Sequence, residues 1–78
     1  MQPNEITAQI VDAAYQIHTK MGPGLLESVY ELVLDFELKK RGLRSRRQVP
    51  IPVEYEGIKF DEGFRADLLV EESVLVEI

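Results

Sequence analysis

The sequence predicts an α+β fold in which two N-terminal helices precede a three-stranded, mainly antiparallel sheet. Apolar residues recur every three or four positions in the first half of the chain and alternate with polar residues in the second half. Glycine and proline separate the segments. We expect one domain over residues 1–78, with helices at about 4–21 and 25–41 and strands at about 47–55, 58–70 and 74–78.

The composition is that of a small globular protein. The chain has 78 residues, 45% of them apolar and 29% charged, and it lacks cysteine, which excludes disulfides and thiolate metal sites. No apolar run approaches the ~20 residues needed to cross a membrane, and no leader pattern opens the chain. We therefore predict a cytoplasmic protein without membrane contact. A domain of this size buries only about 60% of the surface that its unfolded chain exposes, so association with a second chain is an open alternative.

The first helix is predicted from its apolar spacing, with Asn4 as its N-cap. His18, the only histidine, lies on a flank of this helix without another histidine or a cysteine at ligand spacing. That position favours a surface or packing role over a catalytic one. The expected inner residues are Ile6, Ile10, Ala13, Ala14, Ile17 and Met21.

The second helix is bounded by glycines. Gly22-Pro23-Gly24 ends the first helix, and Gly42 is placed to end the second. Glu27 stands in the first turn, where the helix dipole alone is enough to explain an acid. Tyr30 is expected in the core, with its hydroxyl reaching a polar partner. The expected inner stripe is Leu26, Val29, Tyr30, Val33 and Phe36, widened by Leu25 and Leu32.

The strands follow from period-two alternation. Pro50 and Pro52 share one parity in the first strand, which predicts an edge strand with its unpaired side outward. Glu56-Gly57 predicts a tight turn into the second strand, and residues 61–63 predict a bulge or bend within it.

The last hairpin places two acids together. A three-residue loop over 71–73 pairs Val70 with Val74, and counting outward puts Asp67 opposite Glu77. At about 5 Å and an effective dielectric near 20, their repulsion is roughly 3 kcal/mol, which a bridging Mg²⁺ would reverse. The alternative is that both carboxylates are solvated, splayed apart or paired with Arg65.

The net charge of −5 argues weakly against a general nucleic-acid binder. The basic residues are nevertheless concentrated in one segment. Six of the nine basic residues lie within nine positions. Such a cluster suits a phosphate backbone, but it also suits a helix C-terminus or a solvated surface. Both interpretations remain open for Lys39, Lys40, Arg41, Arg44, Arg46 and Arg47.

The segment Gly24-Leu25-Leu26-Glu27-Ser28-Val29-Tyr30 resembles the signature of the GxxExxY protein family, and the likeness extends along nearly the whole chain. That family is grouped with the PD-(D/E)xK nuclease-like superfamily, whose core runs helix, three strands, helix, strand. The resemblance implies Mg²⁺ or Mn²⁺ bound by Asp67 and Glu77, with Glu27 as the helical acid of the catalytic site. It also implies hydrolysis of phosphodiesters and a nucleic-acid partner.

One departure concerns the Glu-x-Lys motif. The 78 residues end at Ile78, so they include neither the lysine of that motif nor the later helix and strand. We therefore expect weak or no catalysis from these residues, with Lys59 and Arg65 as possible replacements for the lysine. The alternative function is a non-enzymatic interaction or oligomerisation module. The unprotected last strand favours a homodimer or a higher oligomer.

Overall fold

The computed structural model describes residues 1–78 apart from the side chain of Glu62. The strands form one antiparallel sheet in the order β1-β2-β3, so the predicted α+β class is confirmed. Within the described residues, no helix is long and apolar enough to span a membrane. The elements are α1 (Pro3–Met21), α2 (Glu27–Lys40), β1 (Ser45–Tyr55), β2 (Ile58–Val70) and β3 (Val74–Val76).

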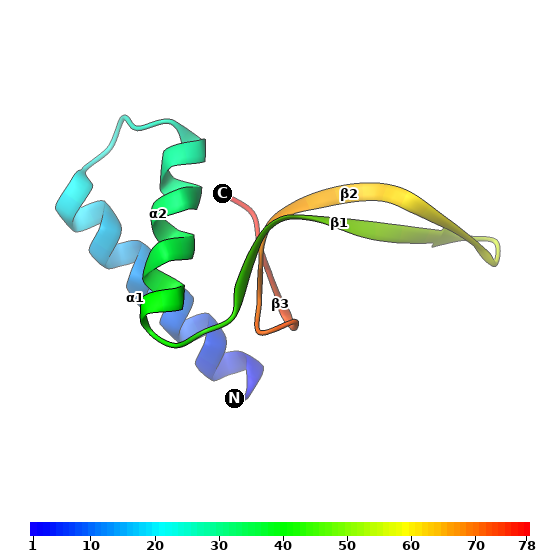
Figure 1. The fold of residues 1–78 in the computed structure, drawn as a ribbon, viewed down its shortest axis with the longest axis horizontal. Coiled ribbons are helices and arrows are strands. Elements are labelled where there is room, and N and C mark those ends of the chain that lie inside the picture. The colour runs from blue at the N-terminus through cyan, green and yellow to red at the C-terminus, as the bar shows by residue number, and fades with distance from the viewer.

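The molecule is elongated because one hairpin projects from a packed base. Its principal extents are 46 × 30 × 16 Å, and the outer part of β1 and β2 extends away from both helices (Figure 1). The core lies where the helices meet the other end of the sheet. There Ala66, Leu68 and Val70 of β2 are fully buried. The outer part of the hairpin therefore contributes little to the core.

Helix α1 begins one residue earlier than the sequence indicated. Pro3 is the first helical residue, and the main-chain N–H of Gln2 donates to Glu5 Oε1 at 3.2 Å, so Asn4 is not the N-cap. Proline suits this position because its fixed φ is already helical. The predicted inner residues are buried except for Ala14, which is exposed, and Met21, which is 42% exposed at the helix end.

Helix α2 ends as predicted but presents a different face to the sheet. Gly42 has φ of 85°, and its N–H donates to the Lys39 carbonyl, as expected for a C-terminal glycine. The predicted inner stripe is wrong at Leu26 and Phe36, which are 73% and 65% exposed, and the two leucines expected to widen it, Leu25 and Leu32, are exposed as well. Apolar residues surround most of this helix, so hydrophobicity alone does not fix its rotation. The residues that face inward are Glu31, Leu34, Asp35 and Leu38.

The turns and the bulge agree with the sequence. Glu56 and Gly57 both have positive φ between the paired residues Tyr55 and Ile58, as a two-residue hairpin turn requires. The pairing of β1 with β2 shifts between Ile51 and Val53, opposite the predicted bulge at residues 61–63. The added residues on β2 account for this shift.

Strand β3 is shorter than predicted. It keeps the expected register, with Val70 opposite Val74, but it ends at Val76 instead of Ile78. The main-chain N–H of Ile78 donates to Asp67 Oδ2 at 2.8 Å. A short polar side chain can replace a main-chain partner in this way and end the ladder.

Candidate metal-binding site

The register of β2 and β3 brings Asp67 to the end of the last hairpin. The final pair of the ladder is Leu68 opposite Val76, so the next positions outward are Asp67 and Glu77. Asp67 is half-buried, whereas Glu77 is exposed just beyond the strand. The strand pairing therefore extends to the position before the predicted acidic pair.

The two oxygens of Asp67 have different surroundings. Oδ2 accepts the strong 2.8 Å hydrogen bond from the Ile78 N–H. Oδ1 has only a long contact, 3.4 Å, from the side-chain amide of Gln48. Asp67 is thus held by one oxygen while the other is weakly engaged.

Glu27, the third predicted ligand, makes no described contact with Asp67 or Glu77. It is the first residue of α2 and is exposed, and none of the described contacts gives its side chain a hydrogen bond or an ion pair. Among the described side chains, no three histidines, cysteines or acids are grouped closely enough to hold a metal ion. A joint site of Glu27, Asp67 and Glu77 therefore stays a prediction.

Glu31 is the acid that the helix does bring to the sheet, and sequence reasoning did not select it. It lies one turn after Glu27 and is 5% exposed. Its Oε2 accepts a hydrogen bond of 2.9 Å from Arg47 Nε and forms an ion pair with Arg47 Nη2, also at 2.9 Å, and its Oε1 accepts a hydrogen bond of 2.7 Å from the Gln48 amide. The sequence gives only a weak indication that Glu31 is buried, since an acid among the apolar residues of a helix is normally expected to face solvent.

Arg47 can reach Glu31 because of its position in the sheet. It pairs with Leu68, whose side chain is fully buried, so Arg47 lies on the face of β1 that is turned to the helices. A buried carboxylate needs a cation or several donors to offset desolvation. Arg47 and Gln48 supply both to Glu31.

The whole basic cluster is paired with carboxylates. The pairs at 2.9 Å are Lys39 with Asp35, Arg41 with Asp12 and with Glu37, Arg46 with Glu72, and Arg47 with Glu31, while Lys40 with Glu37 is at 3.4 Å and Arg44 with Glu71 at 3.3 Å. These pairs offset the positive charge locally. A phosphate group would have to compete with the carboxylates for each cation.

These contacts shift several ionisation equilibria. The hydrogen bond from Arg41 holds the pKa of Glu37 below its ordinary value, and the same bond raises the pKa of Arg41. The main-chain N–H of Arg44 is the largest cause of a lowered pKa at Glu71. All three groups therefore stay charged over a wider pH range than free side chains.

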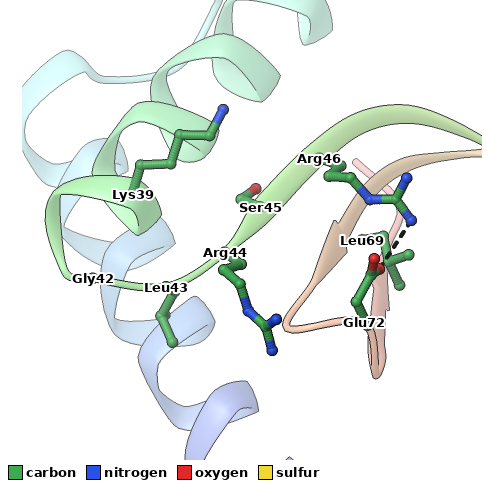
Figure 2. Close-up of a pocket in the computed structure, with 8 residues that line it drawn as sticks. All are labelled: Lys39, Gly42, Leu43, Arg44, Ser45, Arg46, Leu69 and Glu72. Atoms are coloured by element: carbon green, nitrogen blue, oxygen red, sulfur yellow. Dashed lines mark hydrogen bonds and ion pairs between the residues drawn. The ribbon is translucent and has the colours of Figure 1, made fainter.

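A pocket lies beside this cluster, between the end of α2 and the turn from β2 to β3 (Figure 2). Arg46 reaches across it to Glu72, at the position of the dashed line in Figure 2. Arg44 lies on the same segment, and its Nε contacts Glu71. The lining residues are Lys39, Gly42, Leu43, Arg44, Ser45, Arg46, Leu69 and Glu72.

Two helices on an antiparallel sheet, with acids near the β2–β3 end, define an α+β domain with a nuclease-like fold. The family model of the PD-(D/E)XK nuclease superfamily matches residues 4–78, so the chain belongs to that superfamily. Its nucleases generally use divalent metal ions. No curated protein and no solved structure matches the chain.

Proposed function

We propose that the chain provides the carboxylates of a divalent-metal site for phosphodiester hydrolysis, as a member of the GxxExxY family within its superfamily. Asp67 and Glu77 are the proposed metal ligands, and Glu27 is the proposed helical acid. The β2–β3 register carries this proposal, because Asp67 and Glu77 follow directly after the pair of Leu68 and Val76. The predicted cytoplasmic location belongs to the same proposal.

The donor atoms fit a hard cation. Mg²⁺ and Mn²⁺ prefer carboxylate oxygens and bound waters. The only described contact of Asp67 Oδ1 is the 3.4 Å one from Gln48, so this oxygen can bind a metal ion while Oδ2 keeps its hydrogen bond to the Ile78 N–H. Glu77 is exposed, and the described contacts include no hydrogen bond or ion pair of its side chain. Each acid can therefore offer an oxygen without breaking a strong contact.

A bound Mg²⁺ or Mn²⁺ would stabilise charge on a phosphate and lower the pKa of an attacking water. The chain's own contribution is orientation. The Ile78 N–H fixes one oxygen of Asp67, and the sheet fixes the main chain around it. Glu77 stands at a strand end, where its side chain can adjust to the ligand.

The basic cluster supplies the proposed contact with nucleic acid. Arg44 and Arg46 are 75% and 59% exposed in their side chains, and their partners are Glu71 and Glu72. The Arg46–Glu72 pair is exposed on both sides and is worth about 0–1 kcal/mol, and the Arg44 side chain has only a 3.3 Å contact with Glu71, so a polyanion can compete for the two arginines at low cost.

Metal binding by the purified chain tests the proposal. We expect Asp67→Asn and Glu77→Gln each to weaken Mn²⁺ binding by at least about tenfold in isothermal titration calorimetry, because each removes one anionic oxygen ligand. Glu56→Gln is the matched control, since it removes the same charge at the hairpin turn, away from Asp67. Unchanged Mn²⁺ isotherms for Asp67→Asn would exclude this site.

A second candidate function is a non-enzymatic module that binds another copy of the chain. The observation that favours it is the exposed sheet: β3 is an edge strand, and four apolar side chains of the projecting hairpin are 44–66% exposed. These are Val53, Tyr55, Ile58 and Phe60. A wild-type chain that self-associates and shows no Mn²⁺ binding would favour this function over hydrolysis.

A further inference from the structure

One side-chain nitrogen connects two acids from different elements. Gln48 Nε2 lies 2.7 Å from Glu31 Oε1 on α2 and 3.4 Å from Asp67 Oδ1 on β2. The amide NH₂ has two hydrogens, so it can donate to both carboxylates at once. Gln48 is therefore the link between the buried helical acid and the proposed metal ligand.

The backbone of Gln48 is unusual for a strand. Its φ is 54°, in the left-handed region, and the ladder omits it although both neighbours, Arg47 and Val49, are paired with β2. For a residue other than glycine, such a conformation is unfavourable and persists only where surrounding contacts impose it. The bond to Glu31 is the strong contact that the Gln48 side chain makes here.

Glu31 is a fixed anchor for this link. It is 5% exposed, and the Arg47 guanidinium holds its Oε2 at 2.9 Å. Only Oε1 is left for Gln48. The amide group therefore has one rigid partner, Glu31, and one weakly bound partner, Asp67.

We infer that Gln48 is a positioning residue: anchored on Glu31, it turns Oδ1 of Asp67 toward the place where a divalent cation binds. This inference rests on the proposed metal site. Carboxylates that bind metals are commonly held by a second hydrogen bond, and removing that partner typically lowers metal affinity 10–100-fold. Gln48 itself touches no metal.

The decisive variant is Gln48→Gly, which deletes the amide and also suits the positive φ, so the chain is expected to fold. Glu56→Gly is the matched control, because Glu56 also has a positive φ, of 51°, but lies at the hairpin turn. We expect Gln48→Gly to weaken Mn²⁺ binding about tenfold and Glu56→Gly to leave it unchanged. Gln48→Asn tolerates the same φ but is one methylene shorter, so it should lose as much affinity as the glycine variant.

A measurement without metal separates this inference from the proposed function. The Ile78 N–H donates to Asp67, so its amide proton chemical shift in NMR reports the orientation of that carboxylate. Relative to wild type, we expect this chemical shift to change in Gln48→Gly and to remain unchanged in Glu56→Gly. If the shift moves and wild type binds no Mn²⁺, the proposed function fails and the positioning contact stands. An unmoved shift, or equal or tighter Mn²⁺ binding in Gln48→Gly, would overturn the inference.

Discussion

Glu71 shows how one side chain connects two distant segments of this chain. Its Oε2 accepts hydrogen bonds from the main-chain N–H of Arg44 at 2.6 Å and from Arg44 Nε at 3.3 Å. Its own N–H donates to the Arg44 carbonyl at 2.8 Å. The turn between β2 and β3 is thereby fastened to the start of β1.

This contact makes stability depend on pH. The Arg44 N–H lowers the folded-state pKa of Glu71, so the carboxylate stabilises the fold fully above its unfolded-state pKa and loses that effect as pH falls through the lower folded-state pKa. We expect Glu71→Gln to lower the urea midpoint at neutral pH and to approach wild type in acid.

The control for this prediction is Glu56→Gln, because none of the described contacts gives the Glu56 side chain a hydrogen bond or an ion pair. Its urea midpoint should follow that of wild type across the pH range. A constant difference between Glu71→Gln and wild type, also in acid, would show that the lowered pKa is not the cause.

At the scale of the elements, the bulge in β2 depends on a glycine for space. A Cβ added to Gly63 would lie 2.5 Å from the Ile51 carbonyl oxygen and 3.1 Å from Val53 Cβ. A main-chain carbonyl in a paired strand cannot turn aside easily. We expect Gly63→Ala to reduce the free energy of unfolding by about 1–3 kcal/mol, measured by urea denaturation.

A double-mutant cycle tests the steric cause. Val53→Ala removes part of the crowding at Gly63 but leaves the Ile51 carbonyl, so it should recover only a fraction of the loss. Additive effects of the two substitutions, or a Gly63→Ala chain as stable as wild type, would contradict this account of the bulge.

The elements also show where sequence reasoning ends. Turn chemistry predicted the Glu56-Gly57 turn and the β2–β3 register, because left-handed residues and period-two alternation are local properties. The rotation of α2 was not predictable in the same way. Its buried acid Glu31 depends on Arg47 and Gln48, which come from a strand 16 and 17 residues away.

The candidate site likewise has one part that the sequence could predict and one part that it could not. The register that makes Asp67 and Glu77 the next positions after Leu68 and Val76 could be predicted from one hairpin, since Asp67 lies in β2 and Glu77 directly follows β3 across a short loop. The link from Asp67 through Gln48 to Glu31 joins three elements and a strained backbone position, and no local pattern encodes it. Only the packed structure brings these groups together.

At the scale of the whole molecule, two features of the sheet favour self-association: the edge strand β3 and the projecting β1–β2 hairpin. Strand β3 is an edge, and its Leu75 is 45% exposed, whereas Pro50 and Pro52 blunt the other edge on β1. The projecting hairpin is a two-stranded ribbon, which is only marginally stable without further packing. A second copy paired along β3 would extend the sheet about a two-fold axis.

We expect sedimentation equilibrium at micromolar concentration to show a dimer or a larger species. Val76→Lys should dissociate or unfold it, because Val76 packs partly against the core.

Leu75→Lys separates dissociation from unfolding. Because the Leu75 side chain lies outside the core, this variant should leave the circular dichroism spectrum unchanged and give a monomer. Leu32→Lys, on an equally exposed position of α2, should keep the dimer. A folded wild-type monomer, or a Leu75→Lys chain that stays dimeric, would exclude pairing through β3, since a charged edge strand disfavours that contact.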